Sequence, residues 1–166
     1  MKWRRLIHAA YGFFAVAIVL SASVFLFFRD YVRTPGPTTM EQVLIIPDGA
    51  SVRKIGQMLS EARVIRYGFL FPLAYRYLAI DKPLKAGEYK FAIGATPKQV
   101  ITSLVEGRTV IRKLTIPEGL TTYEIYEILR AEDALKGDLP EPVPEGVLMP
   151  DTYHYTYGEL RSSLVE

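Results

Sequence analysis

The stretch IPDGAS at residues 46–51 returns as IPEGLT at residues 116–121, and this repeat decides the expected fold. In both copies an apolar run leads into a Pro-acid-Gly turn, and a hydroxyl residue then stands at the position of a helix N-cap. The apolar positions that follow at helical spacing are Ile55 and Leu59 in the first copy and Ile125 and Leu129 in the second. The repeat predicts two units, each with a strand, a tight turn and an amphipathic helix.

Further elements are expected around the two copies. The sequence predicts strands at 42–46, 87–91 and 109–116, and helices from Val52 to Ala62, from Tyr67 to Ile80 and from the Thr96-Pro97 cap to Gly107. Residues 42–92 then form a β-α-α-β unit. Short strands separated by helices indicate an α+β fold.

An apolar segment near the N-terminus, Leu6 to Phe28, is predicted to span a membrane. Its 23 residues include no Asp, Glu, Lys or Arg, and about 20 apolar residues suffice to cross the hydrocarbon core of a bilayer. Small residues at 21–23 leave a cleaved signal peptide as the alternative. Bulky aromatic residues continue the run beyond them, which favours an uncleaved anchor. Basic residues at positions 2, 4 and 5 favour a cytoplasmic N-terminus.

The chain divides into four expected parts. Residues 1–33 are a cytoplasmic tail and transmembrane helix, residues 34–41 a proline-stiffened linker that lifts the folded part off the bilayer, residues 42–111 an α+β subdomain, and residues 112–166 the beginning of a second domain. Residues 50–113 carry twelve basic and four acidic side chains, whereas residues 114–166 carry three and eleven. This contrast is compatible with docking of the halves on each other, with contact of the basic half with lipid phosphates, or with two ordinary solvated surfaces.

Composition excludes several kinds of site. The chain has no cysteine and two histidines, so neither a disulfide framework nor a thiolate or histidine-rich metal site is expected. The basic residues lack the aromatic interleaving of a nucleic-acid platform, and we predict no nucleic-acid partner.

The stretch PEGVLMPDTY at residues 144–153 contains the candidate catalytic acid, Glu145. Prolines before and after the acid restrict the backbone, and Gly146 allows a tight turn beside it. A carboxyl group presented on such a loop suits acid catalysis, although a plain turn residue shows the same pattern. Acidic residues within 12 positions are expected to raise its pKa if they lie close in space. Glu118, directly before a helix N-terminus, is interpreted as structural.

The motifs EGxxxPDTY at 145–153, IPEG at 116–119 and GEY at 87–89, in this order behind a membrane anchor, resemble those of the MltG/YceG-like endolytic murein transglycosylases of bacteria. The resemblance implies an enzyme of the inner membrane with one transmembrane helix and its bulk in the periplasm. It also implies that residues 42–92 form a LysM-like unit, a fold that binds N-acetylglucosamine-containing glycans. Peptidoglycan glycan strands would be the substrate and peptidoglycan synthases the partners, with no cofactor.

By this resemblance, Glu145 protonates the bond between N-acetylmuramic acid and N-acetylglucosamine and then accepts the proton of the C6 hydroxyl, which leaves a 1,6-anhydro sugar. Asp151, Thr152 and Tyr153 are the candidate substrate-binding residues. For Asp151 and Thr152 a local turn is an equal alternative, and for Tyr153 the alternative is core packing.

A non-catalytic peptidoglycan-binding or divisome scaffold protein is the rival hypothesis. The enzymes that this sequence resembles continue beyond the position of Glu166. We therefore expect a chain of 166 residues to lack part of the substrate cleft, and for that reason to lack full activity.

Overall fold

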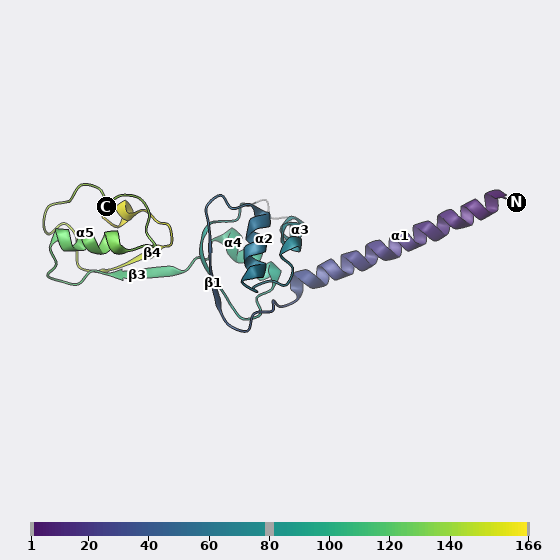
Figure 1. The fold of residues 1–166 in the computed structure, drawn as a ribbon, viewed down its shortest axis with the longest axis horizontal. Coiled ribbons are helices and arrows are strands. Elements are labelled where there is room, and N and C mark those ends of the chain that lie inside the picture. The colour runs from purple at the N-terminus through teal and green to yellow at the C-terminus, as the bar shows by residue number, and fades with distance from the viewer. Residues whose placement is uncertain (1, 79–81, 166) are drawn as a thin grey trace.

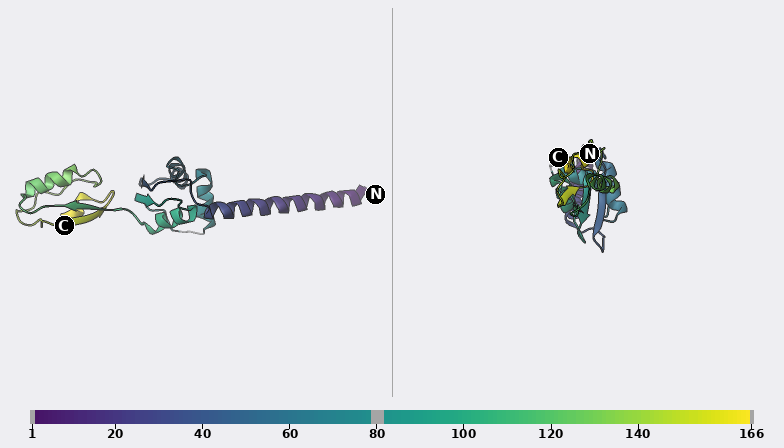
Figure 2. Two further views of the ribbon diagram at one scale, coloured as in Figure 1. Left: turned by 90° about the horizontal axis from the view of Figure 1, so that it is seen from below. Right: turned by 90° about the vertical axis from the view of Figure 1, so that its left-hand side faces the viewer.

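The computed structural model describes residues 2–78 and 82–165, and it places a long helix and two small α+β units in line (Figure 1). Helix α1 (Lys2–Arg33) projects from the first unit, and the second unit lies at the opposite end of the molecule. A side view shows the same elongated arrangement (Figure 2). The mixed α+β class expected from the sequence is confirmed.

The first unit packs three helices and a short 3-10 turn on a two-stranded antiparallel sheet. Its elements are β1 (Gln42–Ile46), α2 (Val52–Glu61), η1 (Gly68–Leu70), α3 (Phe71–Tyr77), β2 (Gly87–Phe91) and α4 (Pro97–Glu106). Strands β1 and β2 pair from Gln42 opposite Phe91 to Ile46 opposite Gly87. Helix α4 begins at a capping box formed by Thr96 and Gln99, which satisfies two of the free N–H groups at the helix start.

The second unit repeats the strand, turn and helix of the first unit. It contains β3 (Ile111–Thr115), α5 (Thr122–Ala131), β4 (Thr152–Thr156) and the 3-10 turn η2 (Arg161–Leu164). Strands β3 and β4 are antiparallel, with Ile111 opposite Thr156 and Thr115 opposite Thr152. The long loop between α5 and β4 carries the candidate catalytic acid.

The predicted repeat is confirmed in three dimensions. Ser51 and Thr121 are the N-caps of α2 and α5, and each side chain accepts a hydrogen bond from the backbone N–H of the residue three positions further along the chain. Gly49 and Gly119 take φ angles of 71° and 87°, which side chains with a Cβ rarely adopt. The equivalent buried pairs are Ile46 and Ile116, Ile55 and Ile125, Leu59 and Leu129, Val64 and Ala134, and Ile65 and Leu135. Two copies of one local pattern therefore build the two cores.

The helix expected from Tyr67 to Ile80 is shorter and interrupted. A 3-10 turn comes first, and α3 begins only at Phe71 because Pro72, which has no N–H, fits the first turn of an α-helix. The expected end, at residues 79–81, lies outside the described residues.

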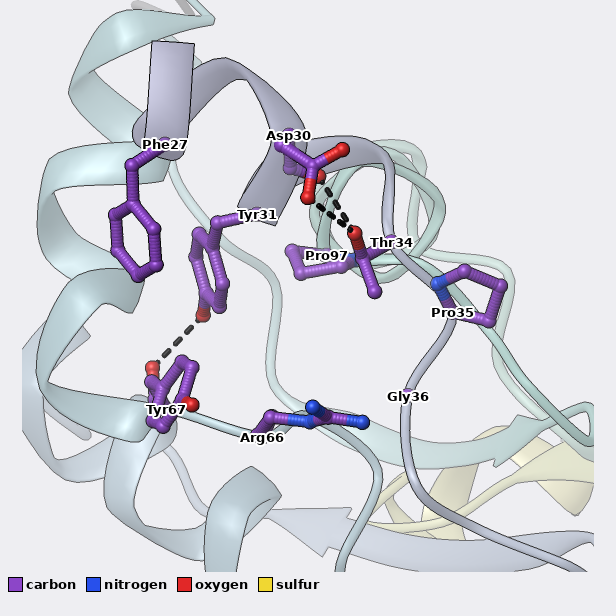
Figure 3. Close-up of a pocket in the computed structure, with 9 residues that line it drawn as sticks. All are labelled: Phe27, Asp30, Tyr31, Thr34, Pro35, Gly36, Arg66, Tyr67 and Pro97. Carbon is purple, nitrogen blue, oxygen red and sulfur yellow. Dashed lines mark hydrogen bonds between the residues drawn. The ribbon is translucent and has the colours of Figure 1, made fainter. Parts of the chain in front are cut away.

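Helix α1 continues into the core of the first unit, and the segment of residues 34–41 that follows it also contacts this unit. Phe28, Tyr31 and Val32 are buried in that core, and the Tyr31 hydroxyl donates to the Tyr67 carbonyl over 2.8 Å (Figure 3). Gly36 donates its N–H to the Ala95 carbonyl. Residues 34–41, predicted to be a spacer, therefore pack against the first unit. This unit directly adjoins the C-terminal end of α1. The reason is that Phe28, Tyr31 and Val32 follow the i, i+3, i+4 spacing of one helix face and continue the apolar side of α1 past Arg29.

An ion pair joins the two units where β2 meets β3. The Arg112 guanidinium donates to both oxygens of Glu88, over 2.7 and 3.0 Å, and Val110 donates its N–H to the Glu88 carbonyl. This pairing raises the pKa of Arg112. Glu88 is 6% exposed, and Arg112 supplies the opposite charge for its buried carboxylate. A second, exposed pair links Lys136 to Asp48 over 2.8 Å.

Gly56 and Gly68 allow α2 and η1 to pack with their backbones in contact. A Cβ at position 56 would lie 2.5 Å from the Gly68 carbonyl oxygen. We expect Gly56→Ala to destabilise the chain by about 1–3 kcal/mol, because overpacking exceeds the gain in helix propensity. Chemical denaturation in detergent measures the change, and Gln57→Ala on the exposed side of α2 is the control. Equal stability of Gly56→Ala and wild type would contradict the close contact.

Candidate functional site

Glu145 lies on the exposed loop between α5 and β4, in a tight turn. Gly146 has a φ of 83°, and Val147 donates its N–H to the Pro144 carbonyl over 3.3 Å. Leu148 is buried in the core of the second unit and anchors the loop there. The Pro-Glu-Gly sequence thus forms a turn that leaves the acid accessible to a solute.

The Glu145 side chain is fixed at the first turn of α5. Thr122 donates both its backbone N–H, over 2.9 Å, and its side-chain hydroxyl, over 3.1 Å, to Oε2 of Glu145. Thr122 is the first helical residue after the cap Thr121 and is 6% exposed. A helix N-terminus attracts negative charge and offers free N–H groups. The two donors therefore hold the carboxyl group in one orientation.

The two oxygens of Glu145 have different surroundings. Oε2 receives both hydrogen bonds from Thr122, and among the described residues no hydrogen bond reaches Oε1. Because the residue is exposed, Oε1 is the oxygen that can carry a proton toward a bound molecule or receive one from it. A single carboxyl group held in this way can act as an acid and then as a base.

The α5 N-terminus is formed by its own capping box, independently of Glu145. The Thr121 backbone N–H donates to the Glu124 carboxylate, and the Thr121 hydroxyl accepts the Glu124 N–H. The Thr121 hydroxyl also donates to the Glu124 carboxylate, and the hydrogen bonds that this carboxylate accepts from the Thr121 N–H and hydroxyl lower the pKa of Glu124. Each of the two acids at this helix end therefore has its own donors, which leaves Thr122 for Glu145.

Asp151, Thr152 and Tyr153 lie at the start of β4, where they make local structural contacts. The Asp151 carbonyl accepts the Ile116 N–H, and its carboxylate accepts the Thr152 N–H over 2.6 Å. The hydroxyls of Thr152 and Thr115 lie 3.0 Å apart across the strands. The Tyr153 hydroxyl donates to the Met149 carbonyl over 2.8 Å. In the described part of the chain, no hydrogen bond joins these residues to Glu145.

Tyr155 and His154, also on β4, differ in how far their side chains are buried. Tyr155 is 3% exposed and packs in the core, where burial raises its pKa, while His154 on the other face is exposed. Among the described residues, the hydrogen bonds to the Glu145 carboxyl group come from Thr122 and not from the nearby acids expected to perturb it. Across the described residues there is no group of three or more acids and histidines suited to a metal ion.

Thr122 is the site residue that sequence reasoning missed. The sequence pattern predicts Thr121 as the N-cap and gives no role to the second hydroxyl residue directly after it. Two consecutive threonines at a helix start, of which one suffices for capping, are the signal that was available.

Three comparisons relate the chain to known proteins. The model of the YceG-like family matches residues 44–166. The crystal structure of a YceG-like protein from Listeria monocytogenes is 24% identical, with a TM-score of 0.48, and the match covers 77% of this chain and 52% of that one. The chain thus spans about half the length of that structure. A comparison with curated proteins gives no match.

Proposed function

Because this chain belongs to the YceG-like family, we propose that it is a membrane-anchored lytic transglycosylase, or the N-terminal part of one, that cleaves peptidoglycan glycan strands internally with Glu145 as its acid and base. The observation that carries the proposal is the fixed Glu145 side chain, which is accessible and held through one oxygen by Thr122.

The reaction needs one protein carboxyl group. Protonated Glu145 gives its proton to the oxygen between N-acetylmuramic acid and N-acetylglucosamine, and the bond from that oxygen to C1 of the muramic acid breaks. The substrate's acetamido group stabilises the cationic C1. The C6 hydroxyl then attacks C1 and returns its proton to Glu145, so the product is a 1,6-anhydro sugar and no water is consumed. This differs from ordinary glycoside hydrolysis, which uses two carboxylates.

Other parts of the chain have supporting roles in this proposal. Helix α1 is long and apolar enough to cross a membrane, with Gly12–Arg33 as the candidate span, and it holds the enzyme at the inner membrane beside newly made strands, with both units in the periplasm. The β-α-α-β unit of residues 42–92 is a LysM-like glycan-binding module. Asp151, Thr152 and Tyr153 shape the loop that presents Glu145, and peptidoglycan synthases are the partners expected at this location.

The products of digestion test the proposal. Purified peptidoglycan is incubated with the protein, and the ends formed are identified by mass spectrometry. A lytic transglycosylase yields 1,6-anhydromuramoyl ends. Reducing ends would indicate a hydrolase, and binding without any cleavage would favour the scaffold hypothesis.

Removal of the Thr122 hydroxyl tests how Glu145 is held. In Thr122→Val the backbone N–H remains and one of the two donors is lost, so we expect about a 10-fold decrease in kcat with little change in KM. Thr122→Ser keeps the hydroxyl and should restore most of the rate. Kinetics of anhydro-product release measure both variants. A rate for Thr122→Val equal to that of wild type would show that the hydroxyl does not position the acid.

A further inference from the structure

A cleft of about 830 Å³ lies between the C-terminal half of α1 and helix α3. The residues that line it include Leu20, Val24, Phe25 and Phe28 on α1 and Leu73 and Tyr77 on α3. The lining is mostly apolar, and Arg76 contributes its charged side chain. A wide apolar cleft open to water on a folded unit indicates a surface that another molecule covers.

The position of the cleft along α1 fixes its depth when α1 crosses a bilayer. Arg29 is the first charged residue after the apolar run, so the hydrocarbon ends near Phe28. The helix rises about 12 Å from Leu20 to Phe28, which is less than the roughly 15 Å half-thickness of the hydrocarbon core. The α1 wall of the cleft therefore lies at the level of one lipid leaflet, and the cleft opens onto lipid.

The first unit cannot move away from this leaflet without unfolding locally. Phe28 and Val32 are buried in its core, and the hydroxyl of Tyr31 is bonded to the Tyr67 carbonyl. α1 is continuous through these residues to Arg33. The depth of α3 is thus set by the depth of α1.

Exposed aromatic and apolar side chains lie on η1 and α3, and those of Leu73 and Tyr77 line the cleft. The Phe69 side chain is 76% exposed, Leu73 52% and Tyr77 47%. The Tyr77 ring packs edge-on against Phe28, with 5.3 Å between centroids, and Tyr67 lies between the rings of Tyr31 and Phe69 at 6.0 Å from each. Tyrosine and other aromatic rings gather at membrane interfaces because one end is apolar and the other polar.

We propose that η1 and α3, residues 68–77, form a membrane-embedded surface whose cleft holds an anionic phospholipid of the leaflet facing the folded units. The acyl chain lies against α1 and Leu73, and the phosphate binds Arg76. The twelve basic and four acidic residues of the segment 50–113 favour an anionic headgroup. The inference rests on the anchor part of the proposed function and is independent of the reaction at Glu145.

The absence of cysteine allows single labels without background. A bimane fluorophore is attached to the full chain through Leu73→Cys. The labelled protein is reconstituted in vesicles of phosphatidylethanolamine and phosphatidylglycerol, and some of the lipids carry a nitroxide near the headgroup end of the acyl chain. Val24→Cys on α1 reports the anchor. Val43→Cys on β1 and Tyr123→Cys on α5 are controls at apolar or aromatic positions that are 54% and 70% exposed. We expect the nitroxide lipids to quench the label at position 73 at least about twofold more than the labels at 43 and 123.

Each other outcome overturns the inference in an identifiable way. Quenching at 24 but not at 73 would leave the anchor and remove the embedded surface. No quenching of the label at position 24 would overturn both the membrane anchor and the embedded surface. A label at 73 that is shielded from water but not quenched would show that protein covers the cleft.

A second arm tests the phosphate contact with Arg76→Glu and the label at 73. The quantity compared is the quenching at 73 in phosphatidylglycerol vesicles divided by the quenching in phosphatidylcholine vesicles. We expect Arg76→Glu to lower this ratio about fivefold, and an unchanged ratio would overturn the phosphate contact. Cleavage assays on the same variants report separately on Glu145.

Discussion

Glu145→Gln is expected to reduce the formation of 1,6-anhydro ends by about 10³-fold or more, because the amide can neither give a proton to the glycosidic oxygen nor take one from the C6 hydroxyl. The substitution keeps an oxygen that can accept both hydrogen bonds from Thr122. The loop should therefore retain its conformation, and the loss should fall on kcat. Single-turnover digestion of purified glycan strands, with products identified by mass spectrometry, measures it.

Glu141→Gln is the matched control for this experiment. Glu141 is exposed on the same loop, and its described hydrogen bond is made by its backbone carbonyl, which accepts the Tyr126 hydroxyl. The side-chain change should leave the rate within about twofold of wild type. Equal product from Glu145→Gln and wild type would remove Glu145 from the mechanism. Equal losses in both variants would point to the charge of the loop instead of one acid.

Arg112→Met is expected to give a large loss of stability, about 2 kcal/mol. The substitution leaves the Glu88 carboxylate, 6% exposed, without its partner at the junction of the two units. Removal of one member of a fully buried pair costs about 3–5 kcal/mol. The Arg112 side chain is 38% exposed, so water relieves part of this cost. Chemical denaturation in detergent measures the change.

A double variant separates the charge from the packing at this junction. Glu88→Gln with Arg112→Met leaves no unpaired charge, so we expect it to be more stable than Arg112→Met alone. Lys136→Met removes the other ion pair between the units, with Asp48, in which the two side chains are 51% and 75% exposed. That variant should remain close to wild type because exposed pairs contribute little. A double variant as unstable as Arg112→Met would attribute the effect to lost packing of the arginine stem.

Local patterns in the sequence predicted the elements well where each residue acts on its near neighbours. The hydroxyl caps, the positive-φ glycines and the apolar spacing of the two repeats all depend on contacts within a few residues, and these are present in the structure. The helix expected from Tyr67 was less accurate, because Pro72 and the close approach of Gly68 to Gly56 divide it. That approach is a tertiary contact with no local signal.

The candidate site was predicted in part for the same reason. The turn around Glu145 follows from Pro144 and Gly146, which are local. Its hydrogen bonds to Thr122 join residues 23 positions apart. A contact of that kind depends on how the loop folds back over α5, and neither spacing nor composition specifies it. The expected acidic surroundings rest on proximity in sequence alone, and they stay a prediction.

The continuity of α1 with the first core has a practical consequence for anyone who shortens the chain to make a water-soluble form. A cut at Thr34, the usual choice after a transmembrane segment, removes three interior side chains, Phe28, Tyr31 and Val32, together with their apolar contacts. The part of the chain that remains then has a cavity in the core of its first unit. A soluble version should therefore start before Phe28 and replace the lipid-facing side chains that precede it with polar ones.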